Sequence, residues 1–158
     1  MTTPKPVPDD LLAILVNVLN RFTERPDDRE TEGIGITLTV GGAVITGQMI
    51  SNTAWFDDMD QKIQDAGGGP WATVFSAKAE GLRAQLGEAS AAEQAVEDLA
   101  DRFAAAVYQV GQTGLIHLKN ARVLTPGSGA GIPGNGMHWR GRLTEVSGWA
   151  FGLLSAGD

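Results

Sequence analysis

The sequence of 158 residues contains no cysteine. This absence excludes a disulfide scaffold and a thiolate metal site, and it agrees with a reducing cytoplasm. Long hydrophobic runs are also missing: the longest early run, residues 11–16, has six residues, whereas a membrane-spanning helix needs about 20. Two acidic residues precede this run, unlike the basic start of a signal peptide. We therefore expect a cytoplasmic protein without a membrane segment.

Basic residues are few: 12 Lys and Arg stand against 19 Asp and Glu, a formal net charge of −7. This balance argues against a broad surface for nucleic acid or anionic membrane. The charge is uneven, because residues 1–112 carry 8 basic and 17 acidic side chains (net −9) and residues 113–158 carry 4 basic and 2 acidic (net +2). The pattern indicates either an acidic helical part over a slightly basic β part or two surfaces that attract each other between molecules.

Glycine, by contrast, is abundant, with 21 residues or about 13%, against a usual share of roughly 7%. Three prolines predict a flexible tail over residues 1–8. Apolar residues spaced by three and four predict a helix over residues 9–24. Alternating residues around Gly41-Gly42 predict a β-hairpin over residues 34–51, with Gly47 at a bend.

The second half of the chain changes from helical to strand character. Residues 52–107 are predicted as a helical insertion, and residues 113–155 as three strands with a glycine-rich loop at 125–136. We expect one α+β domain, with an N-terminal helix, this insertion and a small curled antiparallel sheet or barrel of about five strands.

Three patterns associated with chemistry are weak. The G-x-G-x-x-G at residues 129–134 contains Pro133 and precedes a strand pattern, whereas a phosphate cradle requires a helix. The acidic residues of 57–65 lack the glycine of a calcium loop. A zinc site on His117 and His138, the only histidines, would require neighbouring strands and additional carboxylate ligands. We expect no catalytic residue, cofactor or metal, and hence no enzyme.

Aromatic and cationic residues are interleaved in the predicted C-terminal strands. In nucleic-acid-binding proteins such residues stack on bases and neutralise phosphates. Together with the glycine-containing hairpin, this pattern indicates an alternative function as an Sm-like small β-barrel that binds RNA. The acidic net charge makes nucleic acid the less favoured partner. The candidate partner-binding residues are Lys119, Arg122, Trp139, Arg140, Arg142 and Trp149.

Three segments, in the order of the predicted strands, resemble the gas vesicle accessory proteins of the U type. They are residues 42–51 (GAVITGQMIS), 116–121 (IHLKNA) and 139–148 (WRGRLTEVSG). The Trp55-Phe56 pair and residues 152–155 (GLLS) fit the same family. The helical insertion as a whole is not covered by this resemblance.

The resemblance implies a non-enzymatic cytoplasmic protein that acts in the assembly or clustering of gas vesicles, with the vesicle shell or other gas vesicle proteins as partners. Clustering requires multivalent contacts, which gain avidity from many weak bonds. The acidic and basic parts of the chain suggest electrostatic self-association, aided by Trp139 and Trp149. Such association should weaken as salt rises.

Overall fold

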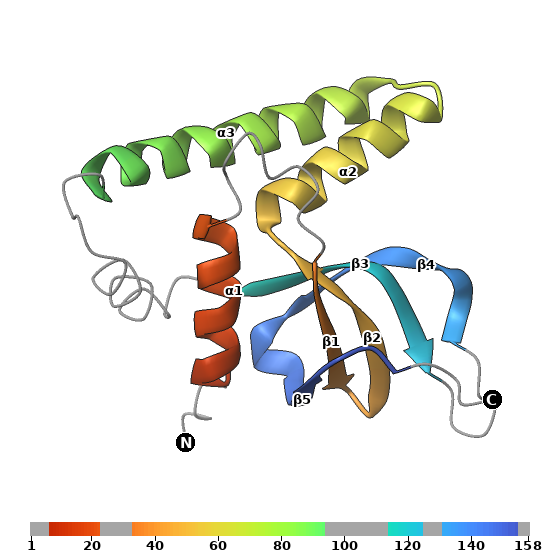
Figure 1. Cartoon of the computed structure of the whole chain (residues 1–158). Helices are drawn as coiled ribbons and strands as arrows, with labels where there is room; N and C mark the ends of the chain where they lie inside the picture. The colour runs from red at the N-terminus through yellow and green to blue at the C-terminus, as the bar shows by residue number, and fades with distance from the viewer. Residues whose placement is uncertain (1–6, 23–32, 94–113, 125–130, 155–158) are drawn as a thin grey trace, which may run out of the picture.

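The computed structural model describes residues 7–22, 33–93, 114–124 and 131–154. A helix, a β-hairpin, two further helices and three further strands follow one another along the chain (Figure 1). Their bounds are α1 Asp10–Phe22, β1 Ile34–Val40, β2 Ala43–Ile50, α2 Asn52–Asp65, α3 Pro70–Glu93, β3 Leu115–Leu124, β4 Gly131–Arg142 and β5 Val146–Phe151, with the short 3-10 helix η2 Leu143–Glu145 between β4 and β5. This order confirms the expected α+β fold with an N-terminal helix and a helical insertion.

The strands form one antiparallel sheet in the order β4-β3-β2-β1-β5. In the hairpin of β1 and β2, Val40 pairs with Ala43, and the connecting Gly41 and Gly42 have φ angles of 57° and 82°. Glycine adopts such angles without a steric penalty, which explains the two-residue turn. The strands β4 and β5 are the two edges of the sheet.

The sheet is strongly curled but does not close. The register of β2 and β3 shifts between Thr46 and Gln48, and at the intervening Gly47 an added Cβ would lie 2.9 Å from the Cα of Ala121. Glycine at this close approach lets the strand bend. Since no pairing joins β4 to β5 in the described part of the chain, the curled sheet is confirmed and the barrel is not formed.

The helix α1 covers one face of the sheet. Asp9 caps it, because the Asp9 Oδ1 accepts a hydrogen bond from the Leu12 amide at 2.9 Å. The same oxygen accepts one from the Trp149 indole at 3.2 Å, which joins the start of the helix to β5. The fully buried core between helix and sheet includes Leu12, Ala13, Val16, Ile36, Leu38, Met49, Ile116, Leu118 and Leu143.

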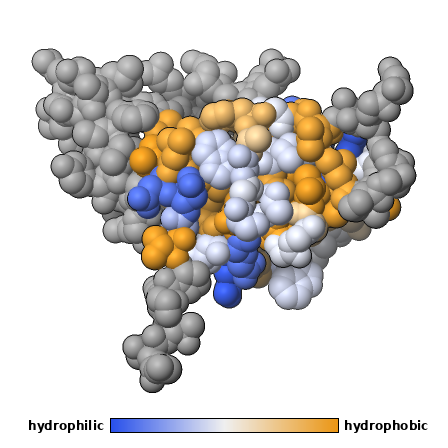
Figure 2. Space-filling model, turned by 90° about the horizontal axis from the view of Figure 1, so that it is seen from below, coloured by the Kyte–Doolittle hydropathy of each residue, from blue (hydrophilic) through white to orange (hydrophobic). Residues whose placement is uncertain are grey.

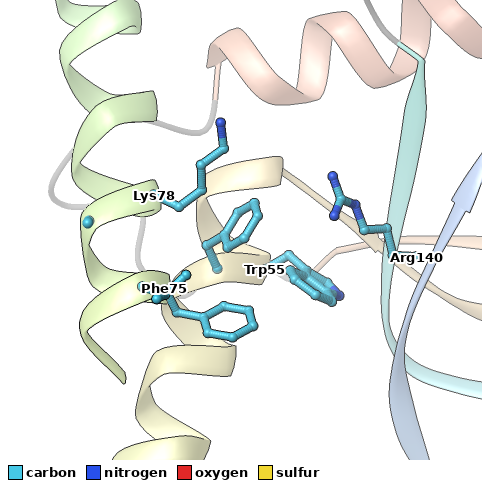
Figure 3. Close-up of a pocket in the computed structure, with 7 residues that line it drawn as sticks. Trp55, Phe75, Lys78 and Arg140 are labelled. Atoms are coloured by element: carbon cyan, nitrogen blue, oxygen red, sulfur yellow. The ribbon is translucent and has the colours of Figure 1, made fainter. Parts of the chain in front are cut away.

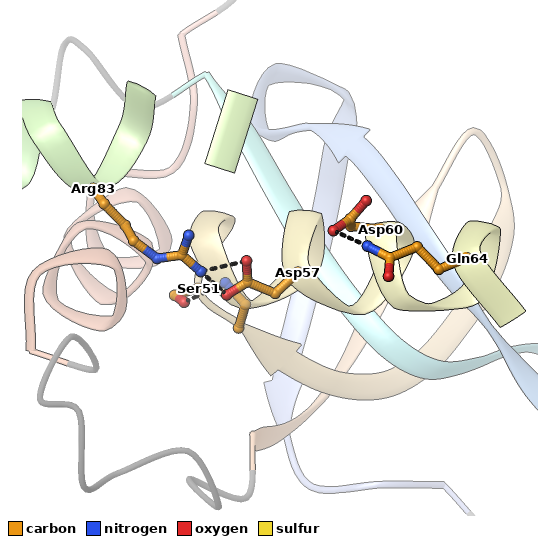
Figure 4. A network of polar contacts seen from close by, with 6 residues as sticks. Ser51, Asp57, Asp60, Gln64 and Arg83 are labelled. Atoms are coloured by element: carbon orange, nitrogen blue, oxygen red, sulfur yellow. Dashed lines mark hydrogen bonds and ion pairs between the residues drawn. The ribbon is translucent and has the colours of Figure 1, made fainter. Parts of the chain in front are cut away.

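The insertion is a hairpin of two helices that crosses one end of the sheet, with α3 above α2 in Figure 1. Ser51 caps α2 by accepting a hydrogen bond from the Ala54 amide at 3.1 Å. Figure 4 shows the polar contacts of α2, among them an ion pair from Asp57 to Arg83 of α3. Between the helices and the sheet lies a second apolar cluster, built on Ile50, Trp55, Phe56 and Ala79.

Two expected boundaries differ from those observed. The strand β4 begins at Gly131, so the prediction of a loop at residues 131–136 is wrong. Strand β3 supplies backbone partners on both sides of the irregular segment 133–136, at Gly131 and Ile132 and again at Met137. The helix α1 ends at Phe22, and residues 23–24 lie outside the described part, as do residues 1–6, 94–107, 113, 125–130 and 155. Within the described residues, no helix is both long and apolar enough to cross a membrane.

Candidate functional site

The six candidate residues do not all lie on the same face of the sheet. Trp139 of β4 and Trp149 of β5 pack, half-buried, against the core between α1 and the sheet. Arg140 follows Trp139 and lies on the opposite face, because successive side chains of a strand alternate. The two tryptophans therefore do not form a stacking surface together with the cations.

The four cations lie on the neighbouring strands β3 and β4. Arg142 is exposed and, two residues beyond Arg140, shares its face. Lys119 is half-buried in β3 and pairs with Gln48. Arg122 is exposed and lines a hollow of about 270 Å³, which Leu153 and Leu154 also line.

Arg140 is the candidate around which a site is built. Its guanidinium carbon lies 5.9 Å from the ring centroid of Trp55 and 5.8 Å from that of Phe56. Both distances are in the range of a cation–π interaction. The aromatic partners of the cation thus come from α2, not from the strands on which the sequence pattern placed them.

A pocket of about 550 Å³ opens beside this contact, between α2, α3 and β4 (Figure 3). Five apolar side chains and two cations line it: Trp55, Phe56, Val74, Phe75, Ala77, Lys78 and Arg140. The α3 residues among them recur at helical spacing, so one face of α3 borders the pocket. None of the lining groups is a carboxylate, an imidazole or a hydroxyl. The lining suits the binding of an apolar group next to an anionic one.

Aromatic rings form the floor of the pocket. The ring centroids of Trp55 and Phe56 lie 5.2 Å apart at an interplanar angle of 85°, an edge-to-face contact. Phe75 adds ring contacts at 6.4 Å to Trp55 and 5.8 Å to Phe56. Aromatic pairs at these distances add to the stability of a cluster beyond the area they bury. The three rings therefore form one continuous aromatic surface.

Beneath the floor lies His117 of β3, whose ring centroid is 5.4 Å from that of Trp55. The side chain is only 2% exposed. Burial, and then the positive charge of Arg140, lower the pKa of His117 from 6.5 to about 4. At neutral pH the ring is therefore uncharged. Neither of its nitrogens, nor the Trp55 Nε1, has a hydrogen-bond partner within the described residues.

The second histidine joins the sheet to the insertion. His138 of β4 places its Nε2 3.0 Å from the Asp58 Oδ2 and its Nδ1 2.8 Å from the Lys62 Nζ. These two contacts tie β4 to α2. Both histidines contact Trp55. Among the described residues no group of three or more possible ligands could hold a metal.

The sequence contained a partial signal for this site. Trp55 and Phe56 stand out as a pair, but only within the family resemblance. Val74, Phe75 and Lys78 form no motif in the sequence, although their spacing places them on one helix face. What the sequence did not reveal is that the insertion folds back onto Arg140.

Fold and site together define a small α+β protein with an aromatic pocket bordered by two cations. A family model described as gas vesicle protein GvpU-like matches residues 9–154. The chain belongs to this family, as its segments of sequence indicated, and the match extends over the helical insertion. Comparison with curated proteins gave no match, and comparison with solved structures gave none either. Family membership makes this a gas vesicle-associated protein.

Proposed function

We propose that the protein is a non-enzymatic accessory protein of the cytoplasm that acts in gas vesicle assembly or clustering through weak, multivalent protein–protein contacts. The observation that carries this proposal is the pocket of Figure 3, whose apolar lining ends at two cations, Lys78 and Arg140. We infer that an apolar side chain next to a carboxylate, on the vesicle shell or another gas vesicle protein, occupies it.

The apolar surface continues beyond the pocket along α3. Trp71 and Val74 are both exposed, and they lie one helical turn apart. Exposed apolar side chains next to a hollow are typical of interaction sites. A second exposed apolar group, at residues 151–154, lies at the end of β5. Two separate contact surfaces on each copy would supply the multivalency that clustering requires.

The uneven charge supports an electrostatic contribution. Asp57, Asp58, Asp60 and Asp65 lie on α2, whereas the four cations lie on β3 and β4. Attraction between acidic and cationic surfaces of different molecules weakens as salt screens it, with a Debye length of about 10 Å at 0.1 M. Association driven by these charges should therefore decrease from low to high salt.

Flotation with purified gas vesicles tests the proposal. The protein should rise with the vesicles on centrifugation, and Val74→Glu should reduce the bound fraction by about tenfold, because it places a carboxylate in the pocket lining. The matched control is Ala84→Glu, which adds the same charge at an exposed position of α3 outside the pocket. Failure of the unaltered protein to float, or equal loss in both variants, would refute the proposal.

An RNA-binding role of the Sm-like type is the second candidate. A helix packed on an open, curled sheet of five strands is compatible with it, and the cations of β3 and β4 would contact phosphates. The position of Trp139 and Trp149 on the opposite face removes the stacking surface that this role would use. Filter binding at about 0.15 M salt separates the two: tight, salt-sensitive RNA binding would favour the second candidate.

A further inference from the structure

The edge strand β5 lacks the features that usually protect an edge. Its sequence, VSGWAF, contains no charged residue and no proline. The opposite edge, β4, contains Pro133 as well as Arg140 and Arg142. Charges and proline on an edge strand prevent pairing with another chain, so β5 is the edge that can accept a further strand.

The hydrogen bonds of β5 show which of its peptide groups face outward. The Gly152 amide donates to the Gly35 carbonyl at 2.8 Å, and in the same register Ala150 lies opposite Thr37. Residues 150 and 152 therefore direct their peptide groups at β1. Because hydrogen-bonding residues alternate along an antiparallel pair, Trp149 and Phe151 direct theirs away from the sheet. In the described part of the chain nothing pairs with these groups.

We propose that β5 pairs antiparallel with β5 of a second copy about a twofold axis at Ala150. This register places Trp149 of each copy opposite Phe151 of the other, and both belong to the outward-facing set. Four backbone hydrogen bonds would form, and the two sheets would become one of ten strands. A twofold contact of this kind is self-complementary and closes at the dimer.

Side chains favour the same register. Trp149 and Phe151 of one chain already form an edge-to-face pair, with ring centroids 5.3 Å apart. Phe151 is nevertheless 60% exposed, and the pairing would bring each Phe151 onto the tryptophan of the other copy. No charge is brought across the axis, since residues 146–154 contain none. Figure 2 shows the lower end of the molecule, where β5 lies, with hydrophobic residues over much of the described surface.

The inference rests on the proposed function in that it adds an uncharged surface for self-association to the charged ones, but it is tested without vesicles, at a salt concentration that suppresses association driven by charge. The mass in solution, measured by light scattering on a sizing column, should be twice that of the 16.6 kDa chain. Phe151→Lys should raise the dissociation constant at least tenfold, because it brings two like charges to the axis. The control Ile132→Lys changes an equally exposed residue of the other edge strand and should leave the dimer intact.

A crosslinking experiment tests the register. The chain has no cysteine, so Ala150→Cys introduces a single thiol, placed opposite its counterpart in a pair without hydrogen bonds. The Cα atoms of such a pair are about 4.5 Å apart, close enough for a disulfide. Ser147→Cys is also at an exposed position. In this register it is offset from its counterpart by six residues, which is about 20 Å at about 3.3 Å per residue. Mild oxidation should link most of the first variant and little of the second.

Distinct outcomes overturn the pairing and the function. A monomer at all soluble concentrations, equal weakening by Ile132→Lys, or equal crosslinking of both cysteine variants would each refute the β5 pairing. A dimer that fails to float with vesicles would refute the proposed function and leave the pairing intact. A monomer that floats with vesicles would refute the β5 pairing and leave the proposed function intact.

Discussion

Lowering the pH from about 7.5 to about 4.5 should weaken the fold through His117. Burial and the charge of Arg140 lower its pKa from 6.5 to about 4, so the ring stays neutral in the folded protein where the unfolded chain protonates it. The unfolded state therefore binds the additional proton in this window, and stability falls as the pH falls from about 6.5 towards 4. Because each factor of ten in proton affinity is about 1.4 kcal/mol, the free energy of unfolding falls by about 2–3 kcal/mol.

Urea unfolding followed by tryptophan fluorescence measures this loss, which corresponds to a midpoint lower by about 1–2 M urea at pH 4.5. The matched variant is His117→Leu, which keeps a buried side chain of similar size and removes the titrating ring. Neither ring nitrogen has a hydrogen-bond partner within the described residues, so the replacement breaks no such contact there.

Every other ionisable group is present in both proteins, so only the difference between the two pH dependences reports on His117. The variant should lose about 2–3 kcal/mol less than the natural sequence over the same interval. Equal losses in the two proteins would show that His117 keeps an ordinary proton affinity, and would refute the reasoning from burial.

Three further predictions concern stability, each measured by urea unfolding. Gly47→Ala should lower the free energy of unfolding by about 1–3 kcal/mol, because its Cβ would lie 2.9 Å from the β3 backbone. The control Gly81→Ala, in open space on α3, should raise the free energy of unfolding by about 0.5–1 kcal/mol. Asp9→Ala should cost about 1 kcal/mol through loss of the α1 cap; an unchanged midpoint would contradict the cap. Arg83→Met should lower the free energy of unfolding by less than about 1 kcal/mol, since its ion pair with Asp57 is half exposed. A larger loss would show that this ion pair contributes more than an exposed pair usually does.

The parts of the fold that follow from local pattern were predictable. Alternation of apolar residues and the Gly41-Gly42 turn define the hairpin within a few residues, and Asp9 marks the start of the first helix. Residues 131–136 were not predictable in this way, because glycine and proline are typical of loops. An edge strand tolerates Pro133, since only one side of the strand requires backbone donors. The deciding contacts come from β3, which no local pattern contains.

The site was predictable only in part, for the same reason. Arg140 could be selected because a cation follows Trp139 in a strand pattern, but alternation places the two on opposite faces. The rings that accept its charge, Trp55 and Phe56, belong to the insertion, and their distance from Arg140 is set by how α2 packs on β3 and β4. A pattern of residue types carries no information on that packing.

The positions of the pocket and of the β5 edge have a joint consequence for clustering. The pocket adjoins β4, at one edge of the strand order, and β5 is the other edge. Pairing through β5 would therefore place the two β4 strands at the outer edges of a ten-stranded sheet. Nine strand spacings of about 4.8 Å separate such edges by up to about 43 Å, and curling shortens this distance. Since each pocket then lies far from the axis, one dimer can bind two partners, whereas a monomer that binds a vesicle through its pocket cannot join it to another by the same contact.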